Sequence, residues 1–305
     1  MGKGAKTVIR SFNGSLADAQ GLLDVERAVF NESPYSAEQL QVMLTGGPQR
    51  TWLAVANGSV TGFVVAFTTS GLHGPRWEID LLAVLPDWRK RGLATRLIRA
   101  ATVQGSRVAP EARAFVATDN EASARAFGQA GFRAKPQLRK LLIYRTEGLV
   151  RREGQTPHVR AKAGVTIRET ATLAEATDWL PELQPPVDHP DLTLLLAEQY
   201  GEPAGYAELV EVQTLLYRGV WIESLTAAVR AVREALVHEA VNWAVDAGQD
   251  EIGAMVPAPD WRLQDSLRAR GFRSLDDFYW LTARLPLPGL AAGQNTTSGS
   301  DGSHG

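Results

Sequence analysis

The second half of the sequence repeats the pattern of the first half at a nearly constant offset. The strongest correspondences are Gly62 with Gly205 (205 − 62 = 143), Ile79-Asp80 with Ile222-Glu223 (222 − 79 = 143) and Gly131-Phe132 with Gly271-Phe272 (271 − 131 = 140). Self-similarity over so long a period indicates that one structural unit has been duplicated. Since two copies must fold from similar patterns, the repeat restricts the chain to a tandem architecture.

The length agrees with that reading, because 305 residues exceed the roughly 100–200 residues of one typical domain. We expect a first domain over residues 1–146 and a second over 165–287. Between them, residues 147–164 are basic and contain Gly154 and Pro157, as in a solvated linker. Residues 288–305 have almost no apolar side chains, so we expect a disordered tail.

Each repeat alternates strand and helix patterns. Asn57-Gly58 joins two strand-like runs and is the favoured type I′ hairpin turn. The first repeat predicts strands at 7–10, 51–56, 60–68, 76–85, 113–117 and 138–146, and helices at 15–30, 36–44, 92–102 and 121–130. The second predicts strands at 165–168, 192–199 and 204–210 and a helix at 229–245. This mixture predicts an α/β class with mixed sheets.

Composition excludes several kinds of chemistry. The chain has no cysteine, and its five histidines show no metal-ligand spacing, so we expect no disulfide, thiol nucleophile or metal site. A net charge of −2 provides no basic field for nucleic acid or an anionic membrane. No apolar run reaches the roughly 18 residues of a transmembrane helix. Neither a signal peptide nor a myristoylation pattern is seen at the start, so we expect a cytoplasmic protein.

Residues 77–98 carry the clearest chemical signal. A strand ends near Pro86, a turn follows with Arg89, Lys90, Arg91 and Gly92, and a helix begins. The first N–H groups of a helix have no intrahelical partner and lie at its positive end, so they bind anions. The sequence therefore predicts a short phosphate site. Neither the P-loop pattern nor the dinucleotide-binding pattern is present in this turn.

Two motifs in this half resemble those of one family. Arg89-x-x-Gly92-x-Ala94 resembles the acetyl-coenzyme A signature of the GNAT N-acetyltransferase superfamily. Asn120, Ser123, Phe127 and Gly131-Phe132 then resemble, in register, the family's second signature. The resemblance implies tandem GNAT-like domains, each a mostly antiparallel sheet flanked by helices. It covers residues 7–146 well and residues 165–285 in outline.

The resemblance implies that acetyl-CoA binds in the first domain, with its pyrophosphate on the turn and its pantetheine arm along a strand that diverges from its neighbour at 113–117. Asn120 would hydrogen-bond that arm, Thr95 would donate from its side chain, and Phe127 would pack beside the thiol end. The residues assigned to the cofactor are Leu82, Ala83, Val84, Arg89, Lys90, Arg91, Gly92, Leu93, Ala94, Thr95, Asn120 and Phe127.

The implied reaction is direct attack of an amine on the thioester, helped by a base. Glu78 and Asp80 lie two apart on a strand and so face the same way. The resemblance implies Glu78 as this base, because several family members have a glutamate base at its position, and Asp80 is the second candidate. Alternatively, both are solvated or pair with Arg76 or another arginine. Many family members have a tyrosine acid where Phe127 stands, and Tyr144 is a substitute for it.

The acceptor implied is a small-molecule or peptide amine. The polar residues Asn31, Glu32 and Tyr35, between the first two helices, are candidates for contacting it; the alternative is a simple polar loop.

The second repeat has lost the phosphate turn. At an offset of 143, Gly92 maps to Ala235, Arg91 to Glu234 and Glu78 to Trp221. We therefore expect a degenerate copy that covers a sheet edge, shapes the acceptor pocket or forms a homo-oligomer contact. Two further functions stay open: an acyl-CoA-binding module without turnover, and a nucleic-acid binder that uses the linker.

Overall fold

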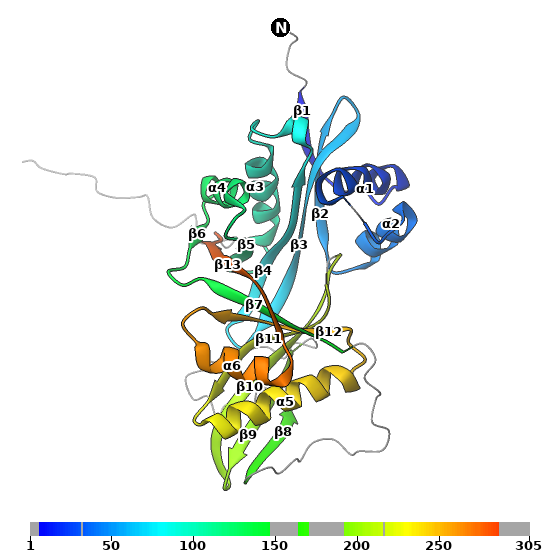
Figure 1. The fold of residues 1–305 in the computed structure, drawn as a ribbon. Helices are drawn as coiled ribbons and strands as arrows, with labels where there is room; N and C mark the ends of the chain where they lie inside the picture. The colour runs from blue at the N-terminus through cyan, green and yellow to red at the C-terminus, as the bar shows by residue number, and fades with distance from the viewer. Residues whose placement is uncertain (1–5, 32, 147–163, 171–191, 216, 287–305) are drawn as a thin grey trace, which may run out of the picture.

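The computed structural model describes residues 6–31, 33–146, 164–170, 192–215 and 217–286. Glu32, nearly all of the expected linker and the expected tail lie outside these residues. The described chain forms two α/β halves that share one continuous sheet of thirteen strands, as Figure 1 shows. The mixed α/β class and the tandem arrangement are confirmed.

The first half follows the predicted order of elements closely. Its elements are β1 (Thr7–Ser11), α1 (Leu16–Phe30), α2 (Ala37–Gly46), β2 (Arg50–Ala56), β3 (Ser59–Gly71), β4 (Gly74–Val84), a short 3-10 helix η1 (Pro86–Trp88), α3 (Leu93–Gly105), β5 (Glu111–Ala117), α4 (Glu121–Gln129), β6 (Arg133–Ala134) and β7 (Arg139–Arg145). Helices α1 and α2 pack on one face of the sheet around Leu22, Leu40 and Phe63. Helices α3 and α4 cover the other face around Leu97, Ile98 and Phe127.

Local signals explain several boundaries of these elements. The Ser15 hydroxyl accepts a hydrogen bond from the Asp18 N–H and caps α1, and Ser36 forms a capping box with Gln39 at the start of α2. Asn57 and Gly58 both have positive φ, of 51° and 81°, as the predicted hairpin turn requires.

The second half contains β8 (Val165–Thr170), β9 (Leu192–Gln199), β10 (Glu202–Gln213), β11 (Arg218–Ala227), α5 (Arg230–Asp246), β12 (Glu251–Pro257), α6 (Trp261–Arg270) and β13 (Arg273–Arg284). Its core lies between the sheet and the helices α5 and α6, around Leu236, Val241 and Leu267. No described helix is both long enough and apolar enough to pass through a lipid bilayer.

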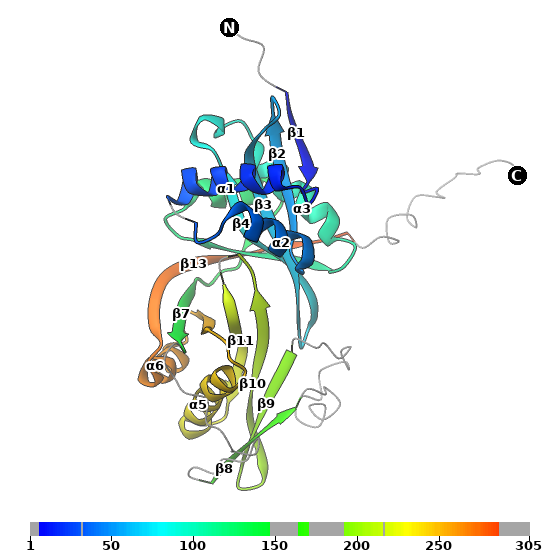
Figure 2. The same cartoon turned by 90° about the vertical axis from the view of Figure 1, so that its right-hand side faces the viewer.

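The two halves exchange their last strands, which the repeat alone did not reveal. Strand β7, which ends the first repeat, pairs antiparallel with β12 of the second half. Strand β13, from the end of the second repeat, pairs antiparallel with β5 of the first half. The two exchanged strands also pair with each other, and Figure 2 shows β13 rising from α6 into the first half. In each half, the part of the continuous sheet that belongs to that half is therefore completed by a strand of the other repeat.

Two hairpin tips make a second exchange. Leu72, at the β3–β4 tip, is buried among Leu194, Leu196 and Val210 of the second half. Its N–H donates to Oε1 of Glu208 at 2.8 Å. In turn, Leu215 of the β10–β11 tip is buried in the first-half core around α1 and α2. Strand and hairpin exchange together make the halves one packed unit.

Candidate active site

Strands β4 and β5 separate in the middle of the sheet, and this separation is the centre of the site. They pair in parallel only from Arg76 to Glu78. Opposite Val65 and Ala66 of β3, β4 has one extra residue, Asp80, so a β-bulge occurs there. Beyond the bulge, β5 continues to pair with β13 but not with β4. The family resemblance implied this divergence along Leu82, Ala83 and Val84. One side of that segment's backbone is left unpaired among the described strands.

The turn at the end of β4 presents a row of free backbone donors. Lys90 and Gly92 have positive φ, of 58° and 72°, which turns the chain sharply into α3. No N–H of residues 90–95 donates a hydrogen bond to any of the residues that the structure describes. A Cβ built on Gly92 would meet nothing within 4 Å. Free donors at a helix N-terminus beside open space suit a pyrophosphate.

The side chains around the turn are held by the protein to different degrees. Arg89 Nε donates to the Val84 carbonyl at 3.1 Å, and the Arg91 guanidinium lies 4.7 Å from the Trp88 ring centre. Leu93 is buried in the core beside α3, and Ala94 packs against the same core. The Thr95 hydroxyl bonds to Gln129 Oε1 at 3.1 Å, so it ties α3 to α4 instead of facing the turn.

The second motif forms the start of α4. Asn120 Oδ1 accepts from the Ser123 N–H at 3.1 Å and caps the helix, while its amide nitrogen forms no hydrogen bond among the described residues. That nitrogen is available to a ligand carbonyl. Phe127 is only 3% exposed and makes an edge-on contact with Phe132, so its ring belongs to the core.

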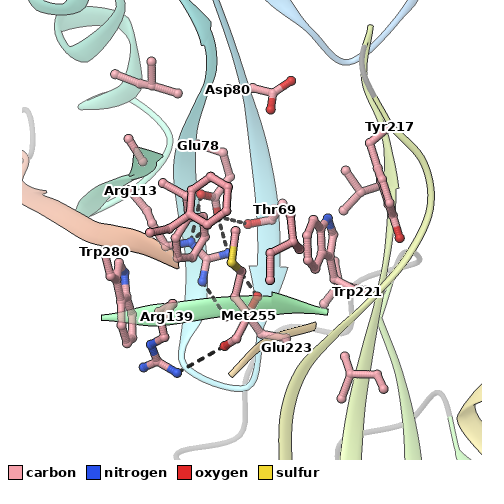
Figure 3. A pocket seen from close by; sticks show the side chains of 18 of the residues that line it. Thr69, Glu78, Asp80, Arg113, Arg139, Tyr217, Trp221, Glu223, Met255 and Trp280 are labelled. Carbon is pink, nitrogen blue, oxygen red and sulfur yellow. Dashed lines mark hydrogen bonds and ion pairs between the residues drawn. The ribbon is translucent and has the colours of Figure 1, made fainter. Parts of the chain in front are cut away.

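A pocket of about 380 Å³ lies between the two halves, next to the gap (Figure 3). Ile79 and Asp80 of β4 and Ala114 and Phe115 of β5 reach it from the two edges of the gap. The second half supplies the facing wall, which includes Val210, Val212, Tyr217, Trp221, Glu223 and Met255. The predicted role of the second repeat in shaping a pocket agrees with this geometry.

Glu78 is part of a buried ion cluster in this pocket. Its carboxylate accepts from Thr69 at 2.6 Å and from Arg113 Nε at 2.9 Å, and Arg76 lies 3.7 Å away. Arg113 also pairs with Glu223 of the second half at 2.5 Å. Burial alone would lower the pKa of Arg113, but the charges of Glu78 and Glu223 outweigh it and raise that pKa. Glu78 thus shows the alternative arrangement considered above, pairing with arginines.

Asp80 differs from Glu78 because no arginine of the described residues forms an ion pair with it. Its side chain is exposed to the pocket space, yet protein from both halves surrounds it. The lost hydration raises the pKa of Asp80 to about 6; a hydrogen bond from Thr214 opposes the rise, and the charge of Glu78 adds to it. An accessible carboxylate that changes charge near neutrality can take a proton from an incoming group.

Tyr144 lies away from the pocket. It follows Ile143 on β7, and Leu141 and Ile143 line the pocket, so the side chain of Tyr144 faces the opposite side of the strand. Its ring packs against Phe272 in the second-half core. The proposal that Tyr144 acts as an acid therefore has to be corrected: Tyr217 is the tyrosine in the described pocket wall. Burial raises the pKa of Tyr217, and its hydroxyl donates to the Val220 carbonyl at 2.7 Å.

The other acceptor candidates also lie apart from the pocket wall. Asn31 is exposed at the C-terminal end of α1, in a left-handed conformation. Glu32 lies outside the described residues. The Tyr35 hydroxyl donates to the Leu215 carbonyl at 3.0 Å, so it contacts the inserted hairpin tip of the second half. Since none of the described candidates lines the pocket, the structure favours the simple-loop alternative for Asn31 and a structural role for Tyr35.

The second half lacks an equivalent turn. Residues 85–92 separate β4 from α3, whereas only Ala228 and Val229 separate β11 from α5. Trp221, at the position equivalent to Glu78, fills space beside Gly253, where a Cβ would come within 2.9 Å of its ring. The connection between β11 and α5 is thus too short for a phosphate turn like that of the first half, which agrees with the expected degeneracy of this copy. The described residues contain no group of three His, Asp or Glu side chains that could hold a metal.

Comparisons with known proteins agree with this geometry. Residues 20–132 match the profile of the acetyltransferase (GNAT) family. A search of curated proteins found no significant match. A GCN5-related N-acetyltransferase from Sphaerobacter thermophilus has a similar fold, with a TM-score of 0.56 at 18% identity over 92% of this chain and 96% of that one. A tandem GNAT protein from the clavulanic acid biosynthesis pathway gives a TM-score of 0.52 at 12% identity, covering 92% and 99%. These structural likenesses establish the fold.

Proposed function

From the premise that residues 20–132 form a domain of the acetyltransferase (GNAT) family, we propose that this protein transfers an acetyl group from acetyl-CoA directly to an amine, using its N-terminal half. Family membership implies acyl transfer from an acyl-CoA to an amine. We further propose that the transferred group is acetyl, that the residues of the first half carry the reaction and that the protein acts in the cytoplasm.

One observation carries the proposal: the β4–β5 gap connects a row of free N–H donors with a pocket that contains an accessible carboxylate. The donors of residues 90–95 and the open space at Gly92 suit the pyrophosphate of acetyl-CoA. The unpaired backbone of Leu82–Val84 and the free amide of Asn120 suit its amide-containing arm. When bound, acetyl-CoA supplies an acetyl thioester, whose bond to sulfur breaks as the bond to the amine nitrogen forms.

Asp80 is the proposed base. An amine reaches a protein mainly as an ammonium ion, which cannot attack a carbonyl until it has lost a proton. With a pKa of about 6, Asp80 is mostly ionised at neutral pH and can both attract the ammonium group and accept that proton. Glu78 has its oxygens engaged by Thr69 and Arg113, so we assign it to positioning Arg113 at the pocket wall.

The test is thiol release from acetyl-CoA, measured with the full chain and a panel of primary amines. We expect amine-dependent release and an acetylated product of matching mass. Binding of coenzyme A without turnover on any amine would instead identify the acyl-CoA-binding module, which the phenylalanine at position 127 keeps open. Affinity that falls steeply with salt for RNA or DNA would point to the nucleic-acid alternative.

A further inference from the structure

Most charges in the pocket neutralise one another. The carboxylates of Glu78 and Glu223 share Arg113 and Arg76, with ion-pair distances from 2.5 to 3.7 Å. Glu251 pairs with Arg145 at 3.7 Å. Two pocket charges remain without an opposite partner within 4 Å among the described residues: the carboxylate of Asp80 and the guanidinium of Arg139.

Arg139 is held in place but incompletely paired. Its guanidinium lies 3.9 Å from the Trp280 ring centre, and Nη1 donates to the Met255 carbonyl at 3.3 Å. Its Nε is buried and has no hydrogen-bond partner within the described part of the chain. Burial lowers the pKa of Arg139; attraction to the more distant Glu223 opposes this without cancelling it, and repulsion by Arg113 adds to it, so keeping this charge in the pocket has a net cost. A planar cation held on an aromatic ring, whose Nη2 forms no hydrogen bond among the described residues and is not buried, is suited to bind a carboxylate.

The two free charges lie at different ends of a largely apolar space. In Figure 3, Asp80 and Arg139 are on opposite sides of the Glu78–Arg113 pair. The pocket lining is largely apolar, with both aromatic and aliphatic side chains, among them Phe67, Phe115, Leu141, Val212, Trp221 and Phe278. A volume of about 380 Å³ is near the lower end of the range for small-molecule sites. The second half, including Tyr217 and Trp221, lines the side opposite β4.

Building on the proposed acetyl transfer, we propose that the acceptor is a small amphoteric amine with a ring-sized apolar body. Its ammonium group lies at Asp80, and a carboxylate at its other end pairs with Arg139. Because the Glu78–Arg113 pair stands between Asp80 and Arg139 in Figure 3, we place the amine and the carboxylate at opposite ends of the apolar body and not on one carbon. The volume of about 380 Å³ also favours a small molecule over a polypeptide N-terminus as acceptor.

The experiment compares two ligands of the same shape, 4-(2-aminoethyl)benzoate and 4-(2-aminoethyl)benzamide. Binding to the full chain is measured by calorimetry without acetyl-CoA, and kcat/KM is then measured by thiol release. We expect the benzoate to bind about tenfold or more tightly than the benzamide, as for one charge-assisted pair. Arg139→Gln removes this preference without changing the KM for acetyl-CoA. Arg139→Lys, which keeps the charge but loses the planar fork, retains part of it.

The matched control is Arg284→Gln, which changes an exposed arginine at the end of the neighbouring strand β13 and leaves the preference intact. Equal affinity of the two ligands in the unaltered protein, or a preference that survives in a folded Arg139→Gln protein, overturns the amphoteric acceptor. Failure of the proposed acetyl transfer looks different: the benzoate preference is present in calorimetry, but no amine supports thiol release.

Discussion

Leu72 and Leu215 stand 143 residues apart (215 − 72), at equivalent hairpin tips, and each is buried in a core that belongs to the opposite half. The side chains are 3% and 2% exposed. This offset is the one at which the sequence repeats, so the exchange of hairpins is as symmetric as the duplication. Each half therefore supplies a core residue that the other lacks.

Replacing either leucine by alanine should destabilise the whole chain. A buried Leu→Ala change leaves a cavity and costs about 2–5 kcal/mol. We expect Leu72→Ala and Leu215→Ala to lower the unfolding free energy by similar amounts, in one cooperative transition measured by chemical denaturation. Leu275→Ala is the control, since Leu275 is 51% exposed. Two separate transitions, each sensitive to one variant, would contradict the shared packing.

The first half should not fold by itself. Without the second half, the edge of β5 loses β13, β7 loses β12, and the pocket loses one wall. Exposed sheet edges and apolar surface favour aggregation. We expect residues 1–146 to be insoluble or unfolded by circular dichroism, whereas the full chain folds. A soluble, fully active fragment would show that the exchange is dispensable.

Gly92→Glu should abolish coenzyme A binding while leaving the fold intact. The new carboxylate would stand among the free donors of the turn and repel a pyrophosphate. Gly248→Glu is a matched control, because Gly248 has a similar φ of 68° and equally open surroundings, in the second half. Binding is measured by calorimetry. Unchanged affinity in the Gly92 variant would mean that the phosphates bind elsewhere.

The pH dependence of catalysis should identify the base. If Asp80 accepts the proton, kcat/KM rises with pH and levels off above about pH 6–7, following its raised pKa. Asp80→Asn should lower kcat by about 100-fold or more and remove this rise of kcat/KM with pH. Glu78→Gln should keep the rise, since Glu78 acts through Arg113. If the rise disappears in Glu78→Gln instead, Glu78 is the base.

Asp80 should also affect stability in a pH-dependent way. Its pKa is higher in the folded than in the unfolded chain, so its contribution is most favourable below the unfolded pKa and is lost as the pH rises through about 6. Asp80→Asn should therefore raise the thermal midpoint relative to the unaltered protein at neutral and alkaline pH. The advantage should disappear in acid. Equal midpoints at every pH would show that the carboxyl is as well solvated in the folded chain as in the unfolded one.

Local signals explain why much of the fold could be predicted. Ser15 and Ser36 set helix starts, Asn57-Gly58 sets a hairpin, and the Arg89–Gly92 turn sits between a strand and a helix, as expected. Each of these signals depends on interactions within a few residues. The duplication could be recognised in the sequence because matching positions of the two repeats are separated by a nearly constant number of residues.

The pocket could not be predicted in the same way. Strand β7 has the same alternation whether it pairs with β5 or with β12, so its sequence does not reveal the exchange. Because β7 pairs with β12, the side chain of Arg139 lines the pocket and that of Tyr144 lies on the opposite side of the strand. Similarly, Glu78 and Asp80 look alike in sequence, and only Arg113 and Glu223, remote along the chain, make them different. Contacts of such high sequence separation leave no local pattern.

The placement of β13 has a consequence for biosynthesis. This strand lies beside β5 in the finished sheet, yet it is translated more than a hundred residues later. While the ribosome is still adding those residues, the nascent first repeat has an incomplete sheet and an open pocket. Domains commonly fold one after another as they emerge from the ribosome. Here the first repeat can complete its sheet only after the last strand of the second repeat has been synthesised. A nascent or prematurely terminated chain therefore contains every residue of the phosphate turn without a finished active site.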